Sequence, residues 1–342
     1  MIASLTPYLA EHVPQVGLIR RLEKFGAGQS NPTYKMITDT GVFVLRTKPV
    51  GVLLRSAHLV EREFEVMSRL SNTAVPVPKM VHLASDKVSP LGRAFFVMEY
   101  LDGRIFWDPS LPDLAAREDR RAIYDAMADR LADLHDVNIE AAGLAEFGKA
   151  GNYFARQTDR WSRQYLASVD EPDRAMTGLM DWLGLHMPDD DGQMGLVHGD
   201  YRLDNMVFAP DRPEVIGLLD WELATLGHPL ADLAYQSMQL RLPSNGAMRG
   251  LGGADRAALG LPSERDYIAR YCARRNIPLP DNWAFYLVFS TFRLAAILQG
   301  VVARAREGNA SNPEVAQKYA ATIPLLIKQA VDIAHDPSEK VI

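Results

Sequence analysis

The sequence predicts an α+β protein with two lobes: a small N-terminal lobe with an antiparallel sheet and one main helix, and a larger, mostly helical C-terminal lobe. Three observations support this fold class. Short β-rich runs separated by glycine and proline fill the first hundred residues. Apolar residues then recur at helical spacing through most of the remaining chain. With 342 residues, of which 47% are hydrophobic, the chain has enough apolar material for about two such lobes.

Charge and cysteine usage exclude several classes of protein. The formal net charge of −6 predicts a field that repels nucleic acid and anionic membranes. Cys272 is the only cysteine, which excludes an internal disulfide and a cysteine-based zinc site and fits a reducing compartment. Residues 1–20 lack the apolar core of a signal peptide, and no run approaches the ~18 apolar residues of a membrane helix. We therefore expect a cytoplasmic protein with neither nucleic acid nor membrane as a partner.

The N-terminal lobe is expected over residues 1–102. Its strands include residues 42–45 and 95–98, where β-branched and aromatic side chains predominate. The main helix is expected over residues 57–70, because its apolar residues fall on one face at 100° per residue. Glu63 lies in the middle of that face. An inward carboxylate needs a cation to offset its desolvation, and Arg46 at the end of the first strand is the predicted partner.

The C-terminal lobe is expected over residues 103–342. Helical periodicity predicts helices near 119–137, 152–168, 229–241, 265–275, 283–300 and 313–336. A β-rich island interrupts them, with short strands at 196–198, 205–208 and 215–219. A loop rich in Gly, Pro and Ser spans residues 242–262 and is long enough to be functional or mobile, so a role as a lid stays open.

Polar residues at the ends of the β-rich island carry the main functional signal. They are His198-Gly199-Asp200, Asn205 and Asp220. Phosphoryl transfer needs one carboxylate to orient the attacking hydroxyl and hard oxygen ligands to hold Mg²⁺ against a triphosphate. Asp200 suits the first role, and Asn205 and Asp220 suit the second. His198 is expected to hold the loop backbone rather than to transfer a proton.

Each of these residues alone would most often be a turn aspartate or a satisfied histidine. Their order and spacing favour the functional interpretation, because they match the H-x-D-x-x-x-x-N catalytic loop of kinases and the metal-binding aspartate that follows it. The same three oxygen-bearing residues argue against the alternative of a catalytically silent nucleotide-binding module, which has no need for both a base and metal ligands. A protein kinase is disfavoured because no A-P-E string follows Asp220.

Longer strings carry a family resemblance. The run VHGDYRLDN at 197–205, with LDWE at 219–222 and GHPLADLA at 227–234, resembles the aminoglycoside phosphotransferase and choline kinase-like family. The strings GQSNPTY at 28–34 and VMEY at 97–100 are most similar to the kinase-like domains associated with acyl-CoA dehydrogenases. The resemblance implies a protein-kinase-like fold and transfer of the γ-phosphoryl group of ATP, with Mg²⁺, to a hydroxyl of a small molecule. It also implies that Asp232 braces the catalytic loop, although an ordinary residue at a helix start would look the same.

A kinase site also needs groups that hold the nucleotide phosphates. The candidate loop is 25–31, where Gly28 lets the backbone approach a phosphate and Ser30 or Asn31 can donate to it. Arg46 stands where, by resemblance, most kinases have a lysine, and Lys48 is the possible substitute.

The adenine site is expected at the junction of the lobes, with the nucleotide between them. The strand at 95–98 runs into Glu99 and Leu101, whose backbone groups resemble the hinge that hydrogen-bonds adenine in kinases. An edge strand that ends in a turn would have the same sequence.

The acceptor site is expected among helices of the C-terminal lobe, at 152–165, around Tyr235 and at 282–300. The basic and aromatic run at 156–161 favours an anionic or thioester-bearing acceptor, whereas acidic groups at 170–173 and 189–191 favour a polycation; both could equally be solvated surface. The resemblance favours a hydroxyacyl-CoA or related hydroxy acid and a functional association with acyl-CoA metabolism. An aminoglycoside or choline-like amino alcohol is the alternative acceptor.

Overall fold

The computed structural model describes residues 1–26, 31–49, 60–149, 151–246, 248–306 and 313–340. Two compact units make up the chain. Unit 1 comprises Met1–Ile105, Ile139–Leu144 and Asn205–Ala224, and unit 2 comprises Phe106–Asn138, Ala145–Asp204 and Thr225–Ile342. The predicted fold class is confirmed, because an antiparallel sheet occupies the N-terminal part and helices dominate the rest.

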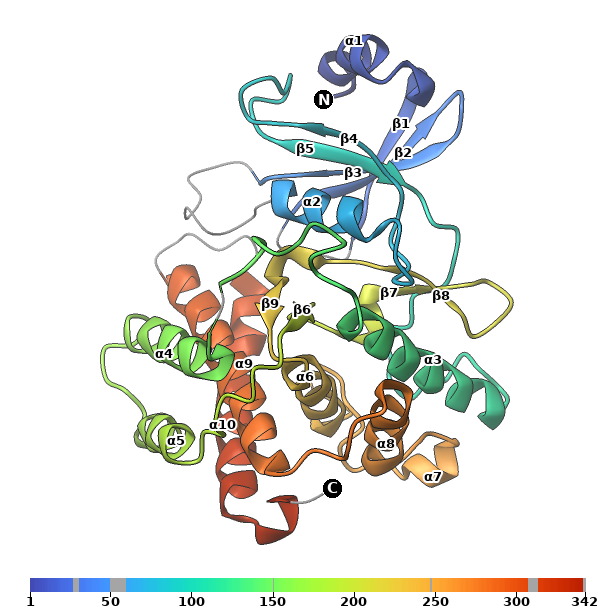
Figure 1. Cartoon of the computed structure of the whole chain (residues 1–342). Coiled ribbons are helices and arrows are strands. Elements are labelled where there is room, and N and C mark those ends of the chain that lie inside the picture. Colours follow the sequence, from blue (N-terminus) through green and yellow to red (C-terminus); the bar gives the residue numbers. More distant parts are fainter. Residues whose placement is uncertain (27–30, 50–59, 150, 247, 307–312, 341–342) are drawn as a thin grey trace. The chain divides into compact units, whose positions relative to one another are not determined.

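Unit 1 is built on a five-stranded antiparallel sheet in the order β1-β2-β3-β5-β4. Its strands are β1 (Ile19–Lys24), β2 (Thr33–Thr38), β3 (Val42–Thr47), β4 (Met80–Ala84) and β5 (Phe95–Glu99). Successive side chains of a strand point to opposite faces. Phe95 and Val97 share one core with the first helix, α1 (Ile2–His12), and the short η1 (Pro14–Val16), whereas Phe96 meets Phe64 of α2 (Val60–Leu70). Each face of the sheet therefore packs on a helix (Figure 1).

Unit 1 also contains a hairpin from the second half of the chain. Strands β7 (Met206–Phe208) and β8 (Val215–Leu218) pair antiparallel and are followed by the short helix η3 (Trp221–Leu223). Gly103 lies so close to this hairpin that a Cβ there would be 2.3 Å from the Phe208 carbonyl oxygen. The adjacent Arg104 forms a bridge with Phe208. This close backbone approach holds the hairpin against the segment that follows the sheet.

Unit 2 is mainly helical. Its helices are α3 (Arg117–His135), α4 (Tyr153–Leu166), α5 (Arg174–Leu185), α6 (Leu230–Arg241), α7 (Arg256–Leu259), α8 (Glu264–Arg275), α9 (Trp283–Arg306), α10 (Pro313–His335) and η4 (Pro337–Lys340). Helix α9 packs against α4, α5, α6 and α10 (Figure 1). Its most apolar stretch has a mean hydropathy of 1.6 and is 83% buried, so this long apolar helix is the core of unit 2. Strands β6 (Gly195–Val197) and β9 (Thr225–Gly227) form a small antiparallel sheet, and η2 (Leu203–Asn205) follows β6.

Every helix predicted in the second half is present, with ends shifted by a few residues. In the part of the chain that the structure describes, three α-helices were not predicted. Helix α1 contains Pro7, which weakens the helical pattern because proline removes a backbone donor. Asp173 is the N-cap of α5, where its side chain accepts from the N–H groups of Ala175 and Met176, so one member of the supposed acidic surface is a helix cap. The short α7 lies within the loop at 242–262.

Candidate active site

An ion-pair network connects three elements of unit 1. Arg46 near the end of β3 lies with its Nε 3.1 Å from the Glu63 carboxylate of α2. Its Nη2 is 2.6 Å from Oδ1 of Asp220, which follows β8. Glu63 is only 1% exposed. The predicted inward direction of Glu63 and its ion pair with Arg46 are therefore both present.

A third carboxylate joins this network. Glu63, Asp220 and Glu222 place carboxylate oxygens within 4.8 Å of one another. Burial raises the pKa of Glu63, and the neighbouring Asp220 and Glu222 act in the same direction while Arg46 opposes them. Burial alone would lower the pKa of Arg46, but the three carboxylates raise it. One guanidinium thus faces three acidic groups, and such a set of oxygen donors suits a hard divalent cation.

Glu222 was not among the predicted site residues. The string LDWE does contain it, two positions after Asp220, but one sequence gives no reason to separate it from an ordinary exposed glutamate.

The two predicted metal ligands lie at the same end of the β7–β8 hairpin. The N–H group of Leu219, the residue immediately before Asp220, donates to the Asn205 carbonyl oxygen at 2.9 Å. Asp220 has a left-handed backbone with φ of 66°, a conformation that aspartate tolerates better than most residues. This turn directs the chain out of β8 and into η3, where Glu222 follows.

The predicted phosphate loop is described only in part. Gly28 and Ser30 lie outside the described residues. Asn31 is 2% exposed, and its side-chain nitrogen donates to Glu63 at 3.0 Å. The Asn31 side chain thus belongs to the ion-pair network, which the sequence did not predict. Lys48 pairs instead with Glu61 at 2.6 Å and Asp86 at 2.8 Å, so Arg46 is the cation of the network.

The predicted hinge residues follow β5. The Glu99 carboxylate accepts from the Lys79 N–H at 3.1 Å. Leu101 packs so tightly on Gly217 that a Cβ on the glycine would be 2.2 Å from Leu101 Cδ1. These contacts explain the local structure, and adenine binding by this segment stays a prediction.

In unit 2, Asp232 of α6 holds the loop that follows β6. Its Oδ2 accepts from the His198 N–H at 2.6 Å and its Oδ1 from the Gly199 N–H at 2.8 Å. Asp232 is completely buried, and Nε2 of His135 lies 3.3 Å from its Oδ2. One carboxylate therefore fixes two successive peptide groups immediately before Asp200.

Protonation follows from these contacts. Burial lowers the pKa of His135 although Asp232 opposes the shift, so the imidazole is neutral near pH 7. Its Nδ1 lies 2.6 Å from the Tyr271 hydroxyl, which can donate to it while Nε2–H donates to Asp232. Burial alone would raise the pKa of Asp232, but the hydrogen bonds from His135 and the Gly199 N–H lower it. Asp232 is thus a charged acceptor at a site without water access.

Asp200 is held by its neighbours in the same loop. Its N–H donates to His198 Nδ1 at 3.3 Å, which agrees with the predicted backbone role of that histidine. Arg202 makes a bidentate pair with Asp204, with Nε 2.8 Å from Oδ1. Burial would lower the pKa of Arg202, but the nearby Asp200 and Asp204 raise it. Burial raises the pKa of the Tyr235 hydroxyl. The negative charge of Asp200, which shares a hydrogen bond with Tyr235, raises that pKa further.

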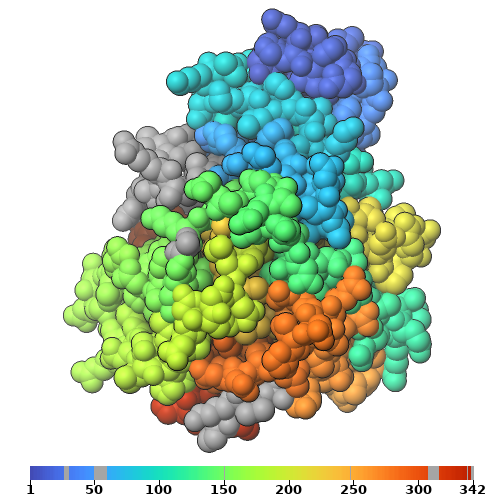
Figure 2. All heavy atoms as spheres, viewed as in Figure 1, coloured from blue at the N-terminus to red at the C-terminus, as the bar shows by residue number. Residues whose placement is uncertain are grey.

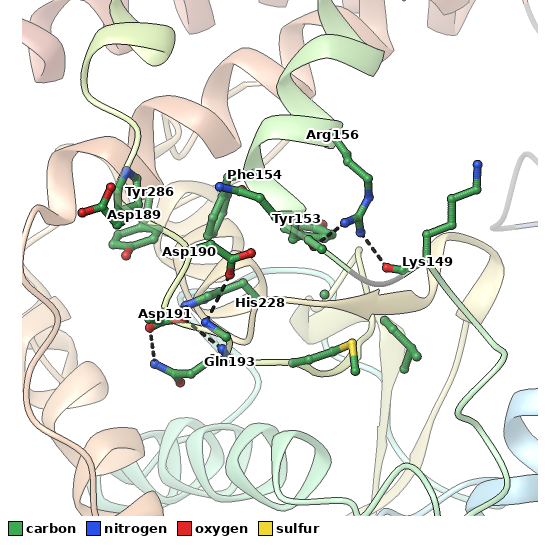
Figure 3. Close-up of a pocket in the computed structure, with 17 residues that line it drawn as sticks. Lys149, Tyr153, Phe154, Arg156, Asp189, Asp190, Asp191, Gln193, His228 and Tyr286 are labelled. Carbon is green, nitrogen blue, oxygen red and sulfur yellow. Dashed lines mark hydrogen bonds and ion pairs between the residues drawn. The ribbon is translucent and has the colours of Figure 1, made fainter.

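A cavity of about 380 Å³ lies elsewhere in unit 2 (Figure 3). Its wall combines the start of α4, the segment 188–194 and the end of β9. The segment 188–194, yellow-green in Figure 2, is at the surface of the face shown. His228 in this wall lies with Nε2 3.3 Å from Asp191, and burial lowers its pKa. None of the predicted catalytic, metal-binding or nucleotide-binding residues lines the cavity, but its wall includes residues from the segments where the acceptor site was predicted: Asn152, Tyr153, Phe154, Arg156, Asp189, Asp190, Asp191 and Tyr286.

Comparison with known families identifies the chain. A model of the phosphotransferase enzyme family matches residues 21–267. The chain belongs to this family. The predicted resemblance is confirmed, and the matched region of this phosphotransferase-family chain contains both the loop at 198–205 and the network around Arg46.

Two mammalian proteins are similar to this phosphotransferase-family chain. It is 46% identical over 297 residues to acyl-CoA dehydrogenase family member 10 of Mus musculus, a match that covers 86% of the chain and 28% of that protein. It is 41% identical over 316 residues to acyl-CoA dehydrogenase family member 11 of Homo sapiens, covering 91% and 40%. The chain thus spans less than half the length of these relatives.

Solved structures share the fold. A crystal structure from Ralstonia eutropha, provisionally named an aminoglycoside phosphotransferase, has a TM-score of 0.85 and 42% identity and covers 98% of each chain. A variant of aminoglycoside phosphotransferase APH(4)-Ia, solved with AMP-PNP and hygromycin B, has a TM-score of 0.61 and 14% identity and covers 95% of this chain and 98% of that one. At that identity the second likeness shows the fold alone.

Proposed function

We propose that this phosphotransferase-family chain is an ATP- and Mg²⁺-dependent kinase that phosphorylates a hydroxyl group on a small molecule. Two arrangements support the proposal: a fixed loop that carries Asp200, and a cluster of carboxylates around Arg46. Unit 2 presents Asp200 on a loop whose backbone Asp232 fixes. Unit 1 gathers three carboxylates around Arg46, a donor set that suits Mg²⁺.

In this proposal Asp200 orients the acceptor hydroxyl and takes its proton as the oxygen attacks the γ-phosphorus. The bond from the γ-phosphorus to the β–γ bridging oxygen breaks, and ADP leaves with that oxygen. Asn205 and Asp220 hold Mg²⁺, which when bound neutralises charge on the triphosphate.

The nucleotide is held by the other predicted residues. Arg46 contacts the phosphates, with Glu63 fixing its direction through the 3.1 Å ion pair. Gly28 lets the loop backbone approach a phosphate, Ser30 or Asn31 donates to that phosphate, and the backbone of Glu99 and Leu101 binds adenine. A nucleotide analogue bound to the distant structural neighbour is consistent with ATP as the donor.

The favoured acceptor is a hydroxyacyl-CoA or related hydroxy acid, and we propose a functional association with acyl-CoA metabolism in the cytoplasm. Support comes from the names of the mouse and human relatives. An aminoglycoside or a choline-like amino alcohol is the second candidate, because the distant neighbour was solved with hygromycin B.

The test is an ADP-release assay over hydroxyacyl-CoAs, hydroxy acids, amino alcohols, sugars and aminoglycosides, run beside Asp200→Ala. We expect acceptor-dependent ADP release that Asp200→Ala reduces by about 10³-fold or more, while Mg-ATP binding by calorimetry is retained. Asp204→Asn, a nearby carboxylate with no proposed chemical role, is the matched control. Mg-ATP binding without turnover on any acceptor would favour the silent nucleotide-binding module.

A further inference from the structure

Two arginines of unit 2 approach one indole ring. The guanidinium carbon of Arg160, on α4, is 4.9 Å from the centroid of the Trp161 ring. That of Arg293, on α9, is 5.7 Å from the same centroid. Among the described residues, neither arginine forms an ion pair with a carboxylate. Two like charges therefore share one aromatic side chain, and within the described residues no directly paired carboxylate neutralises either of them.

Arg293 is also adjacent to the predicted base. It is 4% exposed, and its Nη2 donates to the Gly199 carbonyl oxygen at 2.8 Å. Gly199 directly precedes Asp200, and Arg293 lies 5.3 Å from the ring of Tyr235, which shares a hydrogen bond with Asp200. Arg293 thus lies beside the catalytic loop, where an acceptor hydroxyl would have to be placed, and Trp161 connects it to Arg160.

The fold alone does not account for this charge. Stacking on Trp161 and Tyr235 offsets part of the cost of burying Arg293, and one hydrogen bond satisfies Nη2. Its Nε, however, is buried with no hydrogen-bond partner. A buried cation with an unsatisfied donor is unfavourable unless an anion or strong acceptor completes it. Burial lowers the pKa of Arg160. The positive charge of Arg293 lowers it further, as expected for two cations that repel each other.

We propose that Arg160 and Arg293, together with Trp161, form an anion-binding subsite that selects acceptors with a negative charge near the reacting hydroxyl. The subsite rests on the proposed kinase function for its role in specificity, but not for its ability to bind an anion. A carboxylate or a phosphate would both satisfy the two guanidinium groups. An ammonium group would add a third positive charge, so the subsite disfavours aminoglycosides and choline-like alcohols.

Specificity is tested with three acceptors of one carbon skeleton: 3-hydroxybutyrate, butane-1,3-diol and 4-aminobutan-2-ol. They differ only in an anionic, neutral or cationic end group, and 3-hydroxybutyryl-CoA replaces the carboxylate with a neutral thioester and carries its phosphates far from the hydroxyl. We expect kcat/KM to favour 3-hydroxybutyrate over the diol by about tenfold or more, and the amine to be poorest. Arg160→Gln should reduce that ratio about tenfold, mainly through KM.

A binding measurement separates the subsite from catalysis. Without ATP, 3-hydroxybutyrate, its CoA thioester and inorganic phosphate are titrated while tryptophan fluorescence is followed, with Trp161→Phe to assign the signal. Arg160→Gln should weaken binding about tenfold. Arg163→Gln is the matched control, because Arg163 lies on the same helix, is exposed and pairs with Asp159. Arg293→Lys keeps the charge and tests the planar donor geometry.

The outcomes are distinct. Anion binding that depends on Arg160, without turnover on any acceptor, would support the subsite and overturn the kinase function. A kcat/KM that does not depend on the acceptor charge would support the kinase function and overturn the subsite. Binding that weakens equally in Arg160→Gln and Arg163→Gln would also overturn it.

Discussion

The contact that holds the catalytic loop can be tested through stability. Asp232→Asn changes one atom of the side chain and preserves its shape. The native carboxylate accepts from the N–H groups of His198 and Gly199 and from Nε2–H of His135. The asparagine keeps one accepting oxygen, but its NH₂ group takes the place of the other. That NH₂ group then faces an N–H donor, and neither of the two groups can accept a hydrogen bond. At least one buried donor therefore loses its partner.

The magnitude follows from this count. An unsatisfied buried donor costs about 1–3 kcal/mol, and breaking a buried charged contact costs about 3–5 kcal/mol. We expect Asp232→Asn to lower the free energy of unfolding by about 2–4 kcal/mol. A typical domain has about 5–15 kcal/mol of stability, so the variant should still fold.

Urea denaturation followed by circular dichroism is the assay. Asp332→Asn is the matched control, because Asp332 makes an exposed i,i+4 pair with Lys328 on α10 and should cost about 0.5 kcal/mol or less. If the two variants lose the same stability, the two backbone hydrogen bonds to Asp232 do not stabilise the loop.

Three further predictions follow from other contacts. Arg46→Met leaves Glu63 buried beside two carboxylates and should destabilise the protein by about 3–5 kcal/mol, and Glu63→Gln in the same chain should recover part of it; equal stability of the single and double variants would contradict the ion pair. Burial lowers the pKa of His135 in the folded state, so below about pH 6.5 the imidazole binds a proton in the unfolded chain but not in the folded one. The free energy of unfolding should therefore decline there by up to about 1.4 kcal/mol per pH unit. Urea melts at pH 7.5 and 5.5 should show a smaller decline in His135→Gln, and an unchanged decline would assign it to other groups. Gly103→Ala should lower the melting temperature, because its Cβ would meet the Phe208 carbonyl oxygen at 2.3 Å; an unchanged value would mean that the hairpin shifts at no cost.

Local patterns in the sequence determined the fold class, the positions of most helices and one interior charge. Helical periodicity is a property of short windows, so the inward direction of Glu63 follows from its neighbours on α2 alone. The spacing from His198 to Asn205 likewise lies within one loop and the short helix η2 that ends it. Helix α1 escaped prediction for an equally local reason, because Pro7 interrupts its pattern.

Contacts between distant segments were decided only by the tertiary structure. His135 and Asp232 are separated by 97 positions, and Arg293 and Gly199 by 94, yet each pair meets in the interior of unit 2. Nothing in the sequence around either arginine predicted that Arg160 and Arg293 share the Trp161 ring. A sequence window reports which face of a helix is apolar, whereas the partner of a buried charge depends on how whole helices pack, and that packing is set by the core around α9.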